Sequence, residues 1–373
     1  MAELLTNTTD LTKVAAAIRE KGGTSDPLVY PDGFISAIQA IQTGTELKII
    51  VSVTSGATVT ATKGSLSVSG TSVNGTCTLT IPETGTWSVK ATLGGQTSVI
   101  KSVPFTDSYD VTLTFASSIL NDNDWATIKA VSDEGQGANY WSIGDRKAIT
   151  LNGTVGALTL SNYTTCVFII GFNHNAELEG QNRIHFQLAK TALSGGTDVA
   201  LCDGFYYNTG GGFRMNFSDV NSGGWARSNM RKNICDTSLT SYSGTIISVI
   251  PAALRAVLKP VTKYTNNMGN SNTSVSAVTA TTDYFFLLSE FEVFGSISYA
   301  NTNEKSKQSQ YAYYSAGNSK IKYNHGETST AVIWGLRSPV ATDDVGFVNV
   351  RKDGTVRAGG ADYSFGFAPG FCV

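Results

Sequence analysis

The chain has 373 residues, more than one hydrophobic core usually supports, so two or three domains are expected. Hydrophobic residues make up 41% of the sequence and charged residues only 15%, a composition that favours packed cores over disorder. Lysine and arginine (27) nearly balance aspartate and glutamate (29), so no basic surface points to nucleic acid. No apolar run reaches the roughly 18 residues of a membrane-spanning helix, and residues 1–10 lack the features of a secretion signal. We therefore expect neither membrane insertion nor signal-directed export.

The cysteines are odd in number and widely spaced, and only three histidines are present. Zinc sites need paired ligands at short spacing, and disulfide frameworks belong to short, cysteine-dense chains. Neither a metal nor a disulfide framework is expected, and no cofactor is predicted. We interpret most of the cysteines as small buried hydrophobic residues in a chain that folds in a reducing cytoplasm.

Residues 1–45 carry the clearest helical signals. Asp10 is a natural N-cap, and apolar residues recur at helical spacing after it until Gly22 and Gly23 end the run; these are Leu11, Val14, Ala15 and Ile18. A second run opens at Pro31, with Phe34, Ile35, Ile38 and Ile41. Two such short helices bury little alone. The segment is predicted to attach to another protein or another copy; the alternative is a hairpin packed on its own chain.

Residues 46–116 predict short β-strands. Between Val51 and Thr86, sixteen of 36 residues are serine or threonine, which favours strands and turns over helices. Polar and apolar residues alternate in 47–53, 77–81, 87–93 and 109–115, a pattern typical of a small antiparallel sandwich with Trp87 in its core. The segment resembles the immunoglobulin-like spacer modules of phage tail and bacterial surface proteins. This resemblance implies a stiff, inert spacer.

Residues 117–373 predict a mixed α+β domain. Helices are expected at 124–131, 225–235 and 251–258, and strands at 166–170, 284–288 and 330–334. Long loops rich in glycine and asparagine separate them, and such loops in a compact domain are usually functional or held by packing. We expect Trp141 and Trp334 to anchor the core.

Several short motifs of this third segment occur in the order found in a known domain. They are 141–145 (WSIGD), 168–174 (FIIGFNH), 224–225 (GW), 230–231 (MR), 259–263 (KPVTK), 286–290 (FLLSE), 292–295 (EVFG), 310–314 (QYAYY), 334–339 (WGLRSP) and 367–373 (FAPGFCV). From about residue 120 onward, the chain resembles an uncharacterised domain of phage tail proteins and of surface proteins of Gram-positive gut bacteria. Residues 1–42, with 18–24 (IREKGGT) and 30–34 (YPDGF), are similar to N-terminal segments of prophage tail and baseplate proteins.

That domain is in turn similar to the C-type-lectin-like fold of formylglycine-generating enzymes and of the variable proteins of diversity-generating retroelements. The latter resemblance implies a variable binding surface between Val340 and Phe367. Its candidate receptor-binding residues are Asp343, Asp344, Phe347, Asn349, Arg351, Arg357, Asp362, Tyr363 and Phe365, with Asp353 beside them. Aromatic and guanidinium groups suit such a surface, as in antibody loops. The alternative is a pair of glycine-rich strands whose polar residues only face water.

The residues that support two specific activities of the lectin-like relatives are absent from this sequence. The chain has no Glu-Pro-Asn or Gln-Pro-Asp triplet for calcium-dependent sugar binding, and no paired cysteines between 334 and 372. Residues 121–124 (NDND) offer oxygen ligands, but without an EF-hand spacing a helix-capping turn is the favoured interpretation.

A glycine-rich loop and one arginine each have more than one interpretation. Asp203, Tyr206, Tyr207 and Arg214 lie in a glycine-rich loop that either flanks a ligand site or is only solvated. Arg337 is expected to be a buried structural arginine paired with Asp145 or Glu290.

An enzyme is not predicted. Glycoside hydrolysis needs two carboxylates across a cleft, and the candidate pairs are Glu177 with Glu179 and Glu290 with Glu292. A solvated strand face explains the second pair equally well, and no nucleophile-elbow, zinc-protease or P-loop motif occurs.

The sequence therefore predicts a multidomain phage tail fibre or baseplate adhesin with short N-terminal helices (1–45), an all-β immunoglobulin-like sandwich (46–116) and an α+β C-type-lectin-like receptor-binding domain (117–373). Expected partners are a host-surface glycan or protein and, through residues 1–45, other tail proteins. Analogy with tail fibres favours a homo-oligomer, as a trimer, made in the host cytoplasm and released by lysis within the virion. The alternatives are a structural head or tail decoration protein without a ligand, and a bacterial surface adhesin.

Overall fold

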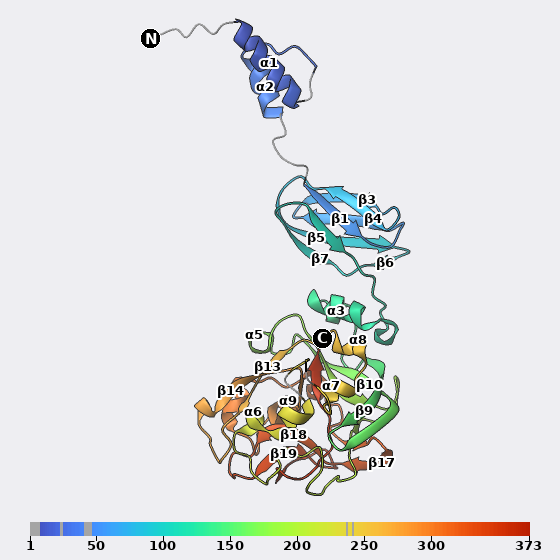
Figure 1. Cartoon of the computed structure of the whole chain (residues 1–373), viewed down its shortest axis with the longest axis vertical. Helices are drawn as coiled ribbons and strands as arrows, with labels where there is room; N and C mark the ends of the chain where they lie inside the picture. The colour runs from blue at the N-terminus through green and yellow to red at the C-terminus, as the bar shows by residue number, and fades with distance from the viewer. Residues whose placement is uncertain (1–7, 23–24, 41–46, 236–237, 241) are drawn as a thin grey trace. The chain divides into compact units, whose positions relative to one another are not determined.

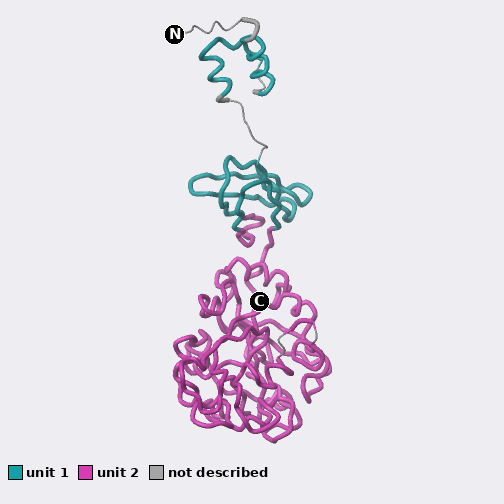
Figure 2. The backbone as a smooth tube through the Cα atoms, turned by 60° about the vertical axis from the view of Figure 1, so that its left-hand side comes forward, with its two compact units in different colours: residues 1–89, 102–112 teal, residues 90–101, 113–373 magenta. Residues whose placement is uncertain are grey.

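The structure is a computed structural model that describes residues 8–22, 25–40, 47–235, 238–240 and 242–373. The chain is multidomain and β-rich, and it divides into two compact units (Figure 2). One unit contains residues 1–89 and 102–112, and the other contains residues 90–101 and 113–373. Within the described ranges, no helix has both the length and the apolar character needed to cross a bilayer.

The N-terminal segment forms two helices, α1 (Thr8–Gly22) and α2 (Asp32–Ala40). Helix α1 begins before Asp10, so this residue lies in its first turn and is not the N-cap that the sequence suggested. The helices pack on each other through a small core of Ala15, Ile18 and Phe34. Of the other predicted stripe residues, Leu11 packs partly buried against this core, and Val14, Ile35 and Ile38 are about half exposed. The predicted stripe residue Ile41 lies outside the described residues.

Eight short strands follow. They are β1 (Lys48–Ser52), β2 (Thr58–Lys63), β3 (Leu66–Thr71), β4 (Thr76–Thr80), β5 (Gly85–Leu93), β6 (Gln96–Thr97), β7 (Lys101–Phe105) and β8 (Tyr109–Thr112). The alternating runs predicted four of them, β1, β4, β5 and β8. One sheet has the order β4-β1-β8 and the other β3-β2-β5-β6, with β7 also paired to β5 (Figure 1). The pairing of β1 with β8 is parallel, which corrects the expectation of a purely antiparallel arrangement. Trp87 is fully buried, as predicted.

The second unit is built around a five-stranded sheet of order β15-β21-β11-β10-β9. Its strands are β9 (Arg146–Val155), β10 (Leu158–Phe172), β11 (Ile184–Lys190), β15 (Phe285–Phe286) and β21 (Gly370–Cys372). Strand β11 is buried along its whole length, because β10 and β21 pair with its two edges and side chains cover both of its faces. The C-terminal strand β21 therefore lies inside the sheet, which makes the end of the chain part of the core.

Smaller sheets complete this unit. They are β12-β16-β17, with β12 (Val199–Ala200), β16 (Lys322–Asn324) and β17 (Glu327–Val332); β13-β14, with β13 (Val261–Asn266) and β14 (Val278–Asp283); and β18-β19-β20, with β18 (Trp334–Pro339), β19 (Gly346–Val350) and β20 (Val356–Gly360). Trp141 and Trp334 are buried, as predicted.

The helices of the second unit are short (Figure 1). Helix α3 places Trp125 against Phe186 and Phe371 of the large sheet, and Asp124 caps it by accepting a 2.7 Å bond from the Thr127 amide, as the capping interpretation of 121–124 predicted. The α-helices are α3 (Trp125–Asp133), α4 (Gly137–Tyr140), α5 (Ala176–Glu179), α6 (Gly224–Arg227), α7 (Ile246–Val249), α8 (Ala252–Arg255), α9 (Glu290–Phe294) and α10 (Ala312–Ser315). The remaining helices are 3-10 turns and one π-helix: η1 (Leu120–Asp122), η2 (Met230–Cys235, the π-helix), η3 (Val275–Ala277) and η4 (Thr302–Ser306).

Candidate functional site

Three of the nine predicted receptor-binding residues are buried, which corrects that prediction for them. Strand β19 is the central strand between β18 and β20, and all five of its residues are buried. Phe347 and Asn349 are therefore only 2% and 1% exposed, and Phe365 is 5% exposed. These side chains support the surface from below and cannot contact a large ligand directly.

The other six predicted residues reach the surface. Asp344, Arg351 and Tyr363 are exposed, and Asp343, Arg357 and Asp362 are half-buried. Asp343 has a local structural role, because its carboxylate accepts hydrogen bonds from the amides of Val345 (3.1 Å) and Gly346 (2.8 Å) at the start of β19. The outward-facing part of the predicted surface therefore lies mainly in the segments on either side of β20.

The glycine-rich loop that follows Asp203 joins this surface. Asp203 is buried, and its carboxylate accepts bonds from the amides of Phe205 (3.0 Å) and Gly212 (2.6 Å) and from the Ser364 hydroxyl (3.0 Å). One side chain thus ties together the beginning of the loop, its return and the C-terminal segment. Gly211 packs against Ser364 so closely that a Cβ would collide with it. The loop is therefore held in place by specific contacts with the C-terminal segment.

Tyr207 at the tip of this loop has an unusual backbone conformation. Its φ is +61°, in the left-handed region that bulky residues rarely adopt. Hydrogen bonds to the C-terminal segment hold it there: the Tyr207 amide donates to the Ser364 carbonyl at 2.7 Å, and the Ser364 amide donates to the Asn208 carbonyl at 2.9 Å. Strained residues of this kind cluster at functional sites.

Aromatic rings gather around Tyr207. Its ring centre lies 5.9 Å from that of Tyr363 and 6.3 Å from that of Phe365, and Tyr363 and Phe365 are nearly parallel. Tyr207 is 48% exposed, Tyr363 37% and the neighbouring Phe205 50%. We call Phe205, Tyr207 and Tyr363 the aromatic surface. Phe205 was not among the predicted site residues, although it precedes two tyrosines in a glycine-rich loop.

Three polar atoms near this surface are buried without a hydrogen-bond partner. They are the Nε of Arg214, the Oδ1 of Asn349 and the Oδ1 of Asp362. Arg214 also lies over the exposed ring of Phe217, 4.6 Å from its centre. Unpartnered buried polar atoms are uncommon in folded proteins and call for a specific explanation, such as a ligand or an ordered water.

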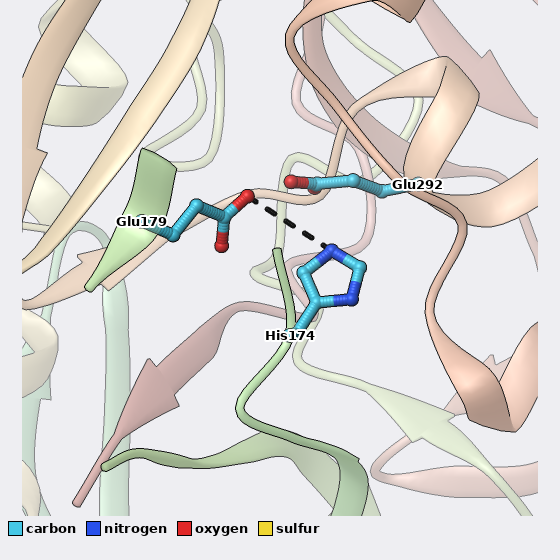
Figure 3. Close-up of side chains that lie close together, drawn as sticks. All are labelled: His174, Glu179 and Glu292. Carbon is cyan, nitrogen blue, oxygen red and sulfur yellow. Dashed lines mark ion pairs between the residues drawn. The ribbon is translucent and has the colours of Figure 1, made fainter. Parts of the chain in front are cut away.

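A cluster of buried titratable side chains lies in the interior of the second unit. His174 follows β10, Glu179 lies on α5 and Glu292 on α9, and Figure 3 shows the three side chains pointing toward one another. All three are buried, with 3.9 Å between His174 Nε2 and Glu179 Oε1. Their ligand atoms lie within 4.8 Å of one another, which is close enough to hold a metal ion.

An ammonium group already fills the centre of this cluster. Lys263 Nζ lies 2.6 Å from Glu179 Oε2 and 2.9 Å from Glu292 Oε1, and it donates to the Tyr311 hydroxyl at 2.8 Å. Arg337 completes the charge balance with two bonds to Glu292, of 2.5 and 2.8 Å. Two buried cations thus neutralise two carboxylates, and these residues do not fit a metal ion.

The pKa values of the cluster follow from burial and from these cations. Burial, with Lys263 nearby, lowers the pKa of His174 to about 3, so the imidazole is neutral and stacks on Tyr311. Burial raises the pKa of Glu179 to about 7. Burial also opposes ionisation of Glu292, but Arg337 and Lys263 outweigh it and hold the pKa of Glu292 well below its usual range. Two buried cations therefore face two buried glutamates, beside a neutral imidazole whose Nε2 has no hydrogen-bond partner.

The environment of Arg337 and of the glutamates corrects two predictions. Arg337 is a buried structural arginine, but its partner is Glu292 and not Asp145 or Glu290. Glu290 and Glu292 lie on α9, where Ser289 and Glu292 form a capping box, and not on a solvated strand face. Glu290 is fully buried and accepts bonds from the amides of Ser298, Tyr299 and Ala300. Neither glutamate faces a cleft.

The cysteines behave as expected from their spacing. All five are buried free thiols: Cys77, Cys166, Cys202, Cys235 and Cys372. Burial raises the pKa of Cys202 and Cys372 to about 12, so neither is a reactive thiolate at neutral pH.

Comparison with known proteins gives one family match. Residues 212–373 match the model of a family described as "Domain of unknown function (DUF6273)". Neither the curated proteins nor the solved structures contain a match. The matched segment includes the surface around β20 and most of the buried cluster, but it begins after Phe205 and Tyr207.

Proposed function

We propose that this chain is a phage tail fibre or baseplate adhesin that binds a host-cell surface receptor. In this proposal residues 1–45 attach it to other tail proteins, residues 46–116 are an immunoglobulin-like spacer, and residues 117–373 are a C-type-lectin-like domain. The order of motifs in the third segment and the similarity of residues 1–42 to prophage tail proteins support this assignment.

The observation that carries the proposal is the aromatic surface on a fixed backbone. Phe205, Tyr207 and Tyr363 expose large rings, while Asp203 and Ser364 hold the loop that presents them. Tyrosine contributes a large contact area at low cost in conformational entropy, so it is enriched in binding hot spots. Because the loop is already ordered, little entropy is lost when a ligand binds.

The helical segment supports the attachment role. Among the described residues of this segment, three form its buried hydrophobic core, whereas Val14, Ile35 and Ile38 are about half exposed. Helices this short gain most of their stability from tertiary packing, so a partner that covers these residues would stabilise the segment. Several copies in one particle would raise avidity, because later contacts become intramolecular.

The test is binding of the labelled full-length chain to a panel of Gram-positive gut bacteria, measured by flow cytometry. We expect saturable binding to at least one strain and a loss of tenfold or more in the Tyr207→Ser and Tyr363→Ser variants. Tyr109→Ser is the matched control, because Tyr109 is 43% exposed but lies on β8 in the other unit.

Two outcomes would contradict the proposal. Equal binding by Tyr207→Ser and the unchanged chain would exclude the aromatic surface as the contact. The structural decoration protein would be favoured by two results together. The purified chain would bind no strain, and particles that lack the chain would adsorb to host cells as well as particles that contain it.

A further inference from the structure

A hollow lined by cationic side chains lies at the turn between β19 and β20. It has a volume of about 230 Å³ and is lined by Ile333, Arg351, Lys352, Asp353 and Arg357. Three of these residues are cationic and one is anionic, so the hollow carries two net positive charges in a chain whose net charge is −2. We call this group the cationic hollow.

The one carboxylate of the hollow offsets only part of its positive charge. The single carboxylate, on Asp353, accepts bonds from the Thr355 amide (3.0 Å) and hydroxyl (2.6 Å) through the same oxygen. Among the ion pairs of the described residues, none involves Arg351, Lys352 or Arg357. Arg357 donates from Nε to the Ala358 carbonyl at 3.0 Å, which fixes one edge of its guanidinium group. An anion would find charged donors here whose positions are partly set.

Tyr206 connects the hollow to the aromatic surface. Its hydroxyl accepts a 2.8 Å bond from the amide of Ile333, which lines the hollow. Its ring centre lies 6.3 Å from that of Tyr207, whose ring is next to Tyr363. Burial raises the pKa of Tyr206, and the hydrogen bond from the Ile333 amide opposes that rise. Tyr206 thus contacts both a lining residue of the hollow and a ring of the aromatic surface.

This combination matches a ligand with an apolar face and an anionic group. The C–H groups on one face of a sugar ring carry partial positive charge, and the faces of aromatic rings are negative. Guanidinium groups bind carboxylates and phosphates with paired, charge-assisted hydrogen bonds. A nucleic acid would instead need an extended basic surface, whereas Asp343, Asp344 and Asp362 belong to the same segment of chain.

We propose that the aromatic surface and the cationic hollow together bind an acidic saccharide, with a sugar ring on Tyr207 and Tyr363 and its carboxylate, phosphate or sulfate group between Arg351 and Arg357. This inference rests on the proposed function and names the receptor's chemical class. The source of the negative charge is shared chemistry, and the test separates the three groups.

The experiment measures binding of the full-length chain to pairs of oligosaccharides, each pair consisting of a carboxylated, phosphorylated or sulfated member and its neutral parent. We expect at least one acidic member to bind tenfold or more tightly than its parent. Arg351→Gln and Arg357→Gln should each weaken that binding about tenfold or more and reduce its dependence on salt, because each removes a charge-assisted contact. Lys305→Gln, at an exposed lysine of η4, is the control, and thermal midpoints verify that the variants fold.

The outcomes separate this inference from the proposed function. Binding to bacteria that depends on Tyr207, without preference for any acidic saccharide, would overturn the inference and leave the adhesin proposal standing. If the chain binds oligoglutamate or single-stranded DNA as tightly as the acidic saccharide, the inference is overturned as well, because the hollow would then attract polyanions without recognising a sugar. If the unchanged chain binds neither any bacterial strain nor any acidic saccharide, both proposals are contradicted.

Discussion

Replacing Asp203 with alanine should destabilise the domain and disorder the loop that carries Tyr207. The buried carboxylate accepts bonds from Phe205, Gly212 and Ser364. Hydrogen bonds to a charged group contribute about 1.5–3 kcal/mol each. Part of this is recovered, because the carboxylate no longer has to be desolvated and the Phe205 amide lies in an exposed loop. We therefore expect a loss of about 2–4 kcal/mol in the free energy of unfolding.

Urea denaturation measures this loss, and amide hydrogen exchange locates it. The Asp203→Ala variant should exchange faster in residues 204–212 and 363–365, while β11 remains protected. Asp344→Ala is the matched control, because this aspartate is exposed, and it should change stability by less than about 0.5 kcal/mol. If the two variants are equally stable, or if exchange in 204–212 is unchanged, Asp203 does not hold the loop and our reasoning about the site fails.

Three further predictions concern buried charged groups, including Glu304 of η4, whose carboxylate accepts bonds from the Asn266 amide (2.9 Å) and the Ser338 hydroxyl (2.8 Å). Arg337→Met leaves Glu292 with one cation and should lower stability by about 3–5 kcal/mol in denaturant titration; a loss below about 1 kcal/mol would contradict the charge balance. Burial raises the pKa of Glu304 from 4.5 to about 7, so its contribution is present below pH 4.5 and is lost as the pH rises through 7, by about 3 kcal/mol. The difference in stability between the Glu304→Gln variant and the unchanged chain should follow that pH window, and a constant difference would refute it. Added zinc should leave the thermal midpoint unchanged, because Lys263 occupies the only metal-like cluster found among the described residues; a rise of several degrees would show otherwise.

Local patterns predicted much of the fold. The alternation around Trp87 gave strands, and Asp124 before an apolar run gave a helix start. Local patterns do not predict which side chains pair when segments far apart in the sequence come together. Glu292 is 45 residues from Arg337, and no local pattern selects it over Asp145 or Glu290.

The candidate surface was predicted in part for a similar reason. The sequence pointed to residues 340–367 as a surface but did not show which of their side chains face outward. Strand β19 lies in this range, and because it is covered on both faces, it lacks the usual alternation of polar and apolar residues. The left-handed backbone of Tyr207 and its contact with Tyr363 depend on hydrogen bonds from a segment more than 150 residues away, which are visible only in the folded chain.

The central claim is that ordered, outward-facing aromatic rings of this domain contact a foreign molecule. Amide hydrogen exchange of the full-length chain, with and without cell-wall fragments from a strain that it binds, tests this most directly. We predict slower exchange in residues 204–217 and 351–363 upon binding, and no change in α9. Protection confined to other regions, or a surface already protected in the free chain by a second copy, would contradict the claim.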